Sequence, residues 1–297
     1  MVKMSNKLLE YSKLHISVLL SGFTGLFPKL ISLNEVLIVW YRMILAFLIF
    51  GVMLIFMKKK PVETRKNIIK FCLLGALLTI HLMFFFGSIK YSNVSIGVVC
   101  YSLVGFFTVF FEPIIQKTKF SYAELLYSLI AVCGIWLIFS FDANFRFGII
   151  LGIISAAIFA LYTVWNKVAE KGKSARCMLF YELFGGAIFM SLFCPIYFKF
   201  NPTSTVFPNG IEWGWLIILA FFCTILLYLI YIDVLKKLSA FTVSIAGNLE
   251  PIYGILFAML FFNEAHELSL PFYTGLGLIL LSVFAQSFRK NKPYKES

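Results

Sequence analysis

The sequence predicts an all-α polytopic membrane protein with ten transmembrane helices, arranged as two inverted five-helix repeats. Of its 297 residues, 61% are hydrophobic and 13% are charged, and the mean hydropathy is +0.91. The apolar residues fall in runs of roughly 20, the length that crosses a bilayer as a helix. A water-soluble domain of this composition would lack the polar side chains needed to cover its surface. We therefore expect lipid around the chain.

Ten apolar runs fit the length of a membrane span. They cover residues 14–31, 35–57, 68–89, 94–115, 122–141, 147–166, 177–198, 213–235, 240–262 and 268–288. Several connections between them are so short that consecutive helices must be antiparallel neighbours. The first run lacks a small-residue cleavage site, and more spans follow it, so we expect it to remain as the first helix rather than act as a cleaved signal.

The distribution of Lys and Arg predicts the orientation. With the N-terminus inside, the outer connections carry only Lys90, Arg146 and Lys199, whereas most other basic residues fall in the inner segments. Positively charged loops stay on the cytoplasmic side of a membrane. We therefore expect a multi-pass protein of the cell (inner) membrane with both termini in the cytoplasm.

The net charge of +12 raises the question of a nucleic-acid partner. A basic cluster at residues 58–66 resembles those of nucleic-acid-binding proteins, but it lies between two apolar runs, where membrane orientation requires positive charge. We expect no nucleic-acid partner. The six cysteines lie inside apolar runs without a CxxC pair, so we interpret them as small hydrophobic residues.

Nothing in the sequence indicates catalytic or metal chemistry. His15, His81 and His266 lie on different segments and at different depths, which is unsuited to a metal cluster or to a nucleophile and its base. The HExxH and GxSxG motifs do not occur. We predict no enzyme activity, no metal and no cofactor.

An internal repeat divides the chain into residues 1–143 and 144–297. At a spacing near 140 to 148 residues, Lys29 matches Lys167, and Tyr41-Arg42 matches Tyr181-Glu182. Five helices are an odd number, so the second copy must enter the membrane from the opposite side. Transporters with such inverted repeats bind their substrate near the midplane, between the two copies.

Three motifs in the expected order resemble the EamA family of the drug/metabolite transporter superfamily. The first is WYR at residues 40–42, followed by Leu45-Ala46, and the second is GIISAAIFALYTVWNK at 152–167. The third, DVLKKLSAFTVSIAGNLEPIYGILFAMLFFNE at 233–264, has a basic-Leu-Ser-Ala entry and a Glu-Pro in mid-helix. The first repeat departs from this pattern, because Gly105 stands where the second has Pro251, so the fourth helix is expected to bend elsewhere.

The resemblance implies a carrier, often an exporter. We expect a secondary transporter, exporter or exchanger, of small metabolites such as amino acids or related amphipathic solutes, which works by alternating access at the midplane. A multidrug or cationic-metabolite carrier of the same superfamily is the alternative. Rivals from other classes are a non-transporting membrane partner protein and an intramembrane enzyme. The coupling ion, protons included, and the choice between monomer and dimer stay open.

Ionisable residues inside spans are the first candidates for the substrate site, since each costs roughly 2.5–3.5 kcal/mol on insertion. At about 1.5 Å rise per residue, Arg42 and His81 lie roughly 10 Å below the outer boundary and Glu250 lies near the midplane. Arg42 and Glu250 are therefore expected to share a layer, whereas Glu182 lies too close to the inner boundary. They could face the substrate path, with Arg42 holding an anionic group and Glu250 an amine, or form a structural pair beside the Pro251 kink.

The remaining candidates are polar or aromatic. Asn248 and Tyr253 flank the kink, and either Glu182 or Glu250 could bind a proton. An aromatic path suited to flat or cationic solutes could be lined by Trp40, Tyr41, Trp165, Tyr181, Tyr228 and Tyr231, although packing roles are equally expected for each. Outside the site, we expect Lys29 to snorkel and Glu264 to be an exposed end of a helix.

Overall fold

The chain folds into helices. The computed structural model describes residues 2–141, 143–170, 172–203, 205–247, 249–266 and 268–287, and these ranges contain no strand. The α-helices are α1 (Val2–Thr24), α2 (Phe27–Leu30), α3 (Glu35–Phe56), α4 (Arg65–Lys90), α5 (Val94–Cys100), α6 (Val104–Gln116), α7 (Tyr122–Phe141), α8 (Arg146–Ala169), α9 (Ala175–Phe200), α10 (Gly210–Ala220), α11 (Leu227–Leu235), α12 (Ala240–Gly247), α13 (Glu250–Phe262) and α14 (Leu270–Ser287). Between them lie the 3₁₀ turns η1 (Tyr101–Leu103), η2 (Ala143–Phe145) and η4 (Glu264–His266) and the π-helix η3 (Phe221–Leu226).

The described part of the chain contains seven helical segments long and apolar enough to cross a membrane. They are Glu35–Phe56, Arg65–Lys90, Val94–Gln116, Tyr122–Ser140, Ala143–Ala169, Ala175–Phe200 and Gly210–Leu235. Two shorter apolar helices, Glu250–Phe262 and Leu270–Ser282, follow. The protein is therefore a polytopic membrane protein, as the composition predicts. The remaining predicted spans are those the structure divides or shortens, such as α1 with α2 and α12 with α13.

Local sequence explains where several helices begin and end. The Asn34 side chain accepts the Val36 N–H at the start of α3, and the Asn93 side chain accepts the Ile96 N–H at the start of α5. Such caps satisfy amides that have no partner inside the helix. Helices α6 and α13 end at residues with left-handed backbone, Lys117 and Asn263, a conformation that closes a helix.

The fourth predicted span breaks at η1, where α5 passes into α6, although its proline, Pro113, lies further along. The ninth span breaks between Gly247 and Glu250. The fourth span was expected to bend at a different place from the ninth, because Gly105 stands where the ninth has Pro251. This expectation is wrong, since the 3₁₀ turn η1 interrupts the fourth helix without a proline.

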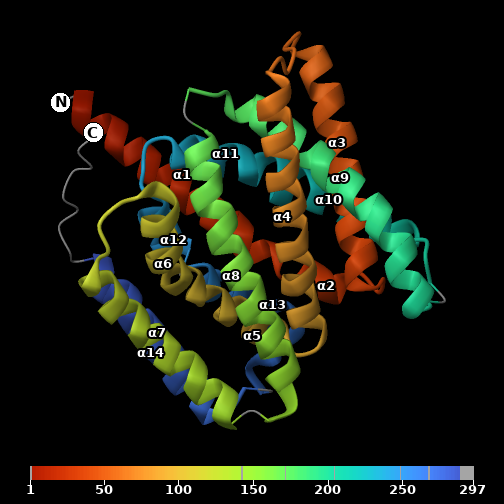
Figure 1. Cartoon of the computed structure of the whole chain (residues 1–297). Coiled ribbons are helices and arrows are strands. Elements are labelled where there is room, and N and C mark those ends of the chain that lie inside the picture. Colours follow the sequence, from red (N-terminus) through yellow and green to blue (C-terminus); the bar gives the residue numbers. More distant parts are fainter. Residues whose placement is uncertain are drawn as a thin grey trace.

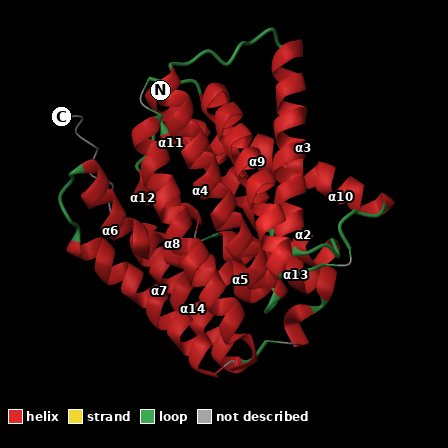
Figure 2. Cartoon of the chain, turned by 45° about the vertical axis from the view of Figure 1, so that its right-hand side comes forward, coloured by secondary structure: helices red, strands yellow, loops and turns green. Residues whose placement is uncertain are grey.

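The helices pack mainly against partners from the other half of the chain. Helix α4 lies between α8 and α9, α3 packs on α9 and α10, and α1 packs on α11 and α13. Helices α7 and α14 lie side by side along one edge of the molecule, away from α3, α9 and α10 (Figures 1 and 2). Glycines permit the closest approach, since a Cβ at Gly75 of α4 would meet the carbonyl oxygen of Glu182 in α9 at 1.8 Å.

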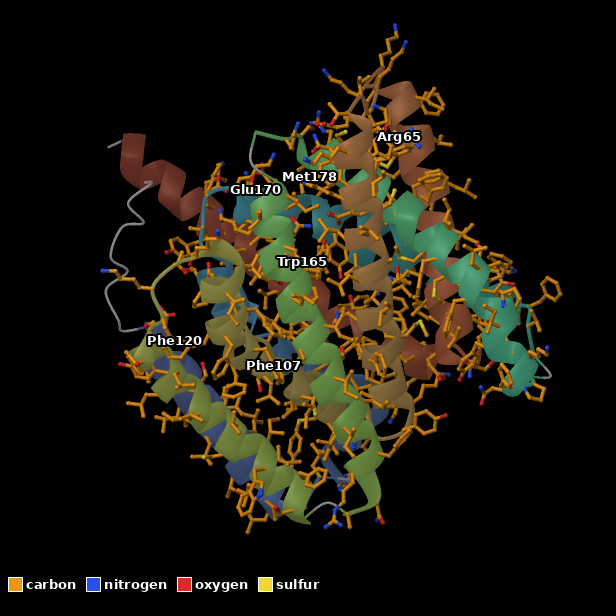
Figure 3. The ribbon with its side chains drawn as sticks, viewed as in Figure 1. Arg65, Phe107, Phe120, Trp165, Glu170 and Met178 are labelled. Carbon is orange, nitrogen blue, oxygen red and sulfur yellow. The ribbon has the colours of Figure 1, made fainter. Side chains whose placement is uncertain are left out.

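The connections alternate between two ends of the molecule. The loops after α3 and α8 lie at the end drawn uppermost in Figure 1, and those after α4 and α7 lie at the opposite end. Figure 3 places Arg65, at the start of α4, at the upper end. This arrangement separates the segments predicted as inner from those predicted as outer.

Candidate functional site

A small cavity lies between helices of the two halves. Its volume is about 30 Å³, room for one or two water molecules and too small for a metabolite. Its lining includes residues from α1, η1, α6, α8, α11, α12 and α13, among them Ser17, Ser21, Tyr101, Phe159, Tyr228, Tyr231 and Glu250. One carboxyl group, two serines and four aromatic rings thus converge on it.

Glu250 provides the carboxyl group of the cavity. Its side chain is 2% exposed, and its Oε2 accepts a hydrogen bond of 2.6 Å from the Ser21 hydroxyl of α1. Glu250 is the first residue of α13 and is followed by Pro251. The positive end of the helix dipole favours an acidic group there. Asn248, the candidate before it, lies outside the described residues.

A cluster of tyrosines separates Glu182 from the cavity. Glu182 of α9 is fully buried and accepts hydrogen bonds from the Tyr162 hydroxyl at 2.9 Å and from the Asn166 amide at 2.7 Å. The ring of Tyr162 lies 6.3 Å from that of Tyr228 and 6.4 Å from that of Tyr231, centre to centre. Since Tyr228 and Tyr231 line the cavity, Glu182 lies behind its wall.

Arg42 does not pair with Glu250 in this conformation. Its guanidinium is 1% exposed and donates from Nε to the Thr224 hydroxyl at 2.7 Å and from Nη2 to the Cys223 carbonyl at 2.6 Å. Both acceptors lie in η3, and the guanidinium carbon lies 5.7 Å from the centre of the Phe86 ring. No described residue forms a hydrogen bond with its Nη1. Arg42 and Glu250, which were expected to share a layer, therefore have separate sets of contacts.

His81 lies behind the aromatic wall of the cavity. Its Nδ1 is 2.8 Å from the Ser155 hydroxyl, and its ring centre is 4.6 Å from that of Phe159 and 5.8 Å from that of Tyr101. Tyr253, on the other side of the kink, contacts His15 of α1. Neither candidate lines the cavity.

The other aromatic candidates lie away from the cavity, so only two of the six expected to form a path contribute to its wall. The side chain of Trp40 binds Ser191, that of Tyr41 binds the Val206 carbonyl, and that of Tyr181 binds the Pro61 carbonyl. Trp165 of α8 is 46% exposed (Figure 3).

Ser21, Tyr101 and Phe159 line the cavity but were missed in the sequence. Ser17 and Ser21 are spaced by one helical turn on α1, and this polar pair in an apolar run was a usable signal. Tyr101 and Phe159 carried none, because aromatic residues are common throughout the spans.

A wider groove lies on the outside of α1. Its volume is about 520 Å³, and it is lined by residues of α1, among them Tyr11 and His15, by Ala246 of α12 and by Leu249 just before α13. Leu14 and Val18 line both this groove and the cavity. A thin apolar layer of α1 therefore separates the two.

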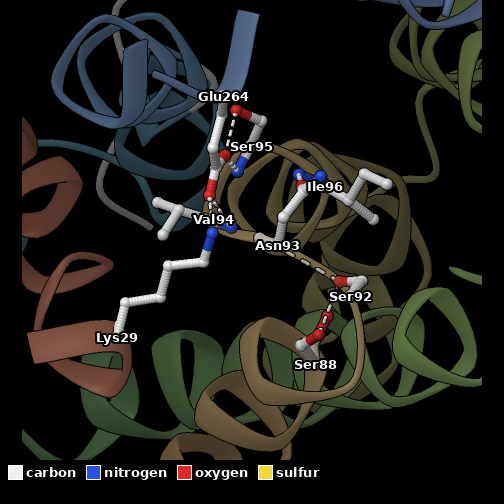
Figure 4. Close-up of polar contacts among 8 residues, drawn as sticks. All are labelled: Lys29, Ser88, Ser92, Asn93, Val94, Ser95, Ile96 and Glu264. Carbon is white, nitrogen blue, oxygen red and sulfur yellow. Dashed lines mark hydrogen bonds and ion pairs between the residues drawn. The ribbon is translucent and has the colours of Figure 1, made fainter. Parts of the chain in front are cut away.

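Ion pairs join the halves at both ends of the bundle. At the predicted outer end, Lys29 of α2 lies 2.7 Å from Glu264, which also accepts hydrogen bonds at the start of α5 (Figure 4). At the predicted inner end, Lys13 of α1 lies 2.8 Å from Asp233. The expectation that Glu264 is exposed is wrong, since it is fully buried, because these partners replace the water that a carboxylate needs.

Comparisons with known proteins agree on a transporter. The sequence model of the EamA-like transporter family matches residues 10–140 and 146–288. GDP-fucose transporter 1 of Dictyostelium discoideum is 25% identical over 291 residues, which cover 91% of this chain and 73% of the relative. The uncharacterized transporter YetK of Bacillus subtilis (strain 168) is 23% identical over 199 residues. That match covers 64% of this chain and 58% of YetK, less than two thirds of the relative's length.

A solved crystal structure of another protein has the same fold, with a TM-score of 0.66 at 14% identity, over 94% of this chain and 96% of that one. Because the family model covers most of the sequence, this chain belongs to the EamA-like transporter family of the drug/metabolite transporter superfamily and is a membrane transporter rather than an enzyme.

Proposed function

We propose that this protein is a secondary transporter, an exporter or exchanger, of small amine-bearing metabolites such as amino acids, and that it works by alternating access around the central cavity. The observation that carries the proposal is the cavity lining, in which the Glu250 carboxyl group faces aromatic rings. A carboxylate and aromatic faces both attract an ammonium group. Among the described residues that line the cavity there is no Lys or Arg.

Two inverted repeats, residues 1–143 and 144–297, with ten spans in all, would place this cavity at the midplane. The packing supports that arrangement. If α1–α2 is the first span and α14 the tenth, α4 of the first half corresponds to α11 of the second, and α1 corresponds to α8. The contact of α4 with α8 should then have a counterpart between α11 and α1, and both contacts occur. Breaks at η1 and after Gly247, and left-handed ends at Lys117 and Asn263, recur at the spacing of the sequence repeat.

The contacts at both ends of the bundle support alternating access. The Lys29–Glu264 pair would have to open for the outer side, and the Lys13–Asp233 pair for the inner side. Among the described residues, Leu14 and Val18 are those shared between cavity and groove, so displacement of α1 from α12 would merge these spaces. We place the protein in the cell (inner) membrane with both termini cytoplasmic, on the charge distribution.

Arg42 supports an amino acid over a simple amine. Its Nη1 is buried and has no hydrogen-bond partner among the described residues, and a guanidinium fork matches a carboxylate. Arg42 would reach the solute only after η3, which it holds through Thr224, changes position.

A multidrug or cationic-metabolite carrier is the second candidate, because Glu250 and the rings that line the cavity would serve it without Arg42. A nucleotide sugar, the substrate class in the name of the Dictyostelium relative, fits less well, since its diphosphate would meet the Glu250 carboxyl group and, among the described lining residues, no basic side chain.

Counterflow in proteoliposomes tests the proposal. Labelled amino acids, amines, organic cations and a nucleotide sugar would be tested on the wild type, Glu250→Gln and the control Glu124→Gln in α7. We expect amine-bearing solutes to exchange, and Glu250→Gln to slow them about 10- to 100-fold, the worth of a charge-assisted hydrogen bond of about 1.5–3 kcal/mol. Wild-type exchange of nucleotide sugars alone, or full activity of Glu250→Gln, would refute it.

A further inference from the structure

A second carboxyl group is buried outside the cavity, without a cation. Glu182 is fully buried, and its hydrogen-bond partners, the Tyr162 hydroxyl and the Asn166 amide, are neutral. Within the described residues, no ion pair involves it; the pairs found lie toward the ends of the bundle. Two neutral hydrogen bonds offset only part of the cost of burying a carboxylate. Taking up a proton removes that cost.

The groups packed around Glu182 do not supply a counter-charge. Among the described residues, the titratable side chains beside it are Tyr162 of α8 and, behind that ring, Tyr228 and Tyr231 of α11, all neutral at pH 7. On α4, the backbone of Cys72 lies against Gly185, three residues further along α9. Arg42 of the neighbouring helix α3 is bound to η3. Helix α4 approaches the Glu182 backbone closely at Gly75.

An unpartnered acceptor marks the same place. The Oδ1 of Asn166 is buried and has no hydrogen-bond partner within the described part of the chain, while its Nδ2 donates to Oε1 of Glu182 at 2.7 Å. If the amide turned over, Oδ1 would face Oε1 and accept a hydrogen bond from the protonated carboxyl group. The residues present therefore suit both the ionised and the protonated form of Glu182.

The tyrosine cluster connects this carboxyl group with the cavity. Tyr162 binds Glu182 directly, and its ring packs against Tyr228 and Tyr231, which line the cavity together with Glu250. The Tyr231 hydroxyl lies 2.6 Å from that of Thr163 in α8. Tyr162 and the two lining tyrosines are therefore the side chains through which a change in the charge of Glu182 can affect the cavity.

We propose that Glu182 is the proton-binding site of a proton-linked transport cycle, separate from the solute site at Glu250. The carboxylate takes up one proton when its surroundings open to one side of the membrane and releases it when they open to the other. Uptake forms one O–H bond on the carboxylate and release breaks it, and no other covalent bond changes. The inference rests on the proposed transport function and adds the coupling ion and the residue that carries it.

The test separates coupling from transport in proteoliposomes, with the amine-bearing solute that the wild type exchanges. Counterflow at equal pH needs no net proton movement, whereas uphill uptake driven by an imposed pH gradient does. Glu182→Gln resembles a permanently protonated carboxyl group, so we expect counterflow to persist and gradient-driven uptake to be lost. Glu250→Gln should slow both about 10- to 100-fold, and Glu124→Gln should keep both.

Several outcomes would overturn the inference. Wild-type counterflow without any response to a pH gradient would leave the transport function intact and remove the coupling. Normal gradient-driven uptake by Glu182→Gln, or loss of its counterflow with normal thermal stability, would also contradict a separate proton site. Absence of wild-type counterflow for every solute would instead refute the transport proposal.

A second variant covers poor folding of Glu182→Gln. Tyr162→Phe removes a hydrogen bond to the ionised form of Glu182, so it should move the pH profile of gradient-driven uptake toward higher pH. An unchanged profile would count against Glu182.

Discussion

Replacing Glu264 tests whether its buried carboxylate holds the predicted outer end of the bundle together. The carboxylate lies 2.7 Å from Lys29 and accepts hydrogen bonds from the Val94 and Ser95 amides and the Ser95 hydroxyl at 3.0, 2.9 and 2.7 Å (Figure 4). Glu264→Gln keeps the size of the side chain but replaces one acceptor oxygen by an NH₂ group. That group would face Lys29 or the amides, all of which are donors.

The expected loss follows from burial. Removing one partner of a buried ion pair costs about 3–5 kcal/mol. Glu264 is fully buried, whereas the Lys29 side chain is 30% exposed and can recover water, so we expect a loss of about 2–3 kcal/mol, at or below the lower end of that range. For a chain of this size, that corresponds to a fall in Tm of about 5–10 °C.

The same contacts predict a pH dependence. Burial by itself would raise the pKa of Glu264, but hydrogen bonds from Lys29, Ser95 and Val94 outweigh it and hold the pKa below its usual range. A carboxyl group with a lowered folded-state pKa stabilises the protein above its unfolded pKa, about 4.3. This stabilisation is lost as the pH falls through the folded-state pKa, so Glu264→Gln should flatten the stability curve below about pH 4.

Thermal unfolding in detergent between pH 3 and 7 measures both effects. Lys29→Gln and the double variant complete a cycle, in which the double variant should lose less than the sum of the single losses. Glu124→Gln in α7 is the control. If Glu264→Gln and the control had equal Tm values at pH 7, the reasoning on this buried pair would fail.

Four further predictions concern packing, charge and orientation. Gly75→Ala should lower the free energy of unfolding by at least the cost of overpacking, about 1–3 kcal/mol, and with it Tm and expression, because the added Cβ would meet the backbone of α9. Arg42→Lys should slow counterflow nearly as much as Arg42→Gln, because one ammonium group cannot replace both bonds to η3. Asp233→Asn should cost less than about 1 kcal/mol in thermal unfolding, since its pair with Lys13 is partly exposed. A reporter active only in the periplasm, fused to the C-terminus, should stay silent.

Helix positions were predictable from the sequence because the length of an apolar run sets them. The run at 35–57 became α3, Glu35–Phe56, and the run at 94–115 became Val94–Gln116. The breaks within spans were less predictable. The fourth span bends at η1 without a proline, because backbone geometry there depends on the packing of α5 and α6 against other helices.

The facing directions of side chains could not be predicted. The rise per residue gives the depth of a group along its helix, but not which neighbour it faces. Arg42 and Glu250 were expected in one layer, yet Arg42 turns toward η3 and Glu250 toward α1. Aromatic residues have the same limitation, because lipid and the protein interior both accommodate them. Tyr228 lines the cavity, whereas Trp165, an equal candidate, is 46% exposed.

The first span contacts the second half of the chain at the predicted inner end, at the cavity and at the predicted outer end. Lys13 of α1 binds Asp233 at the predicted inner end, Ser21 binds Glu250 at the cavity, and Lys29 of α2 binds Glu264 at the predicted outer end. All three partners come from the second half of the chain. Any movement that opens the cavity to one side by displacing this span must break at least one of these contacts. The break between α1 and α2, after Thr24, lies between the cavity and the Lys29–Glu264 contact. Helix α1 can therefore move away from Glu250 while Lys29 of α2 stays bound to Glu264, or α2 can move while Ser21 stays bound to Glu250.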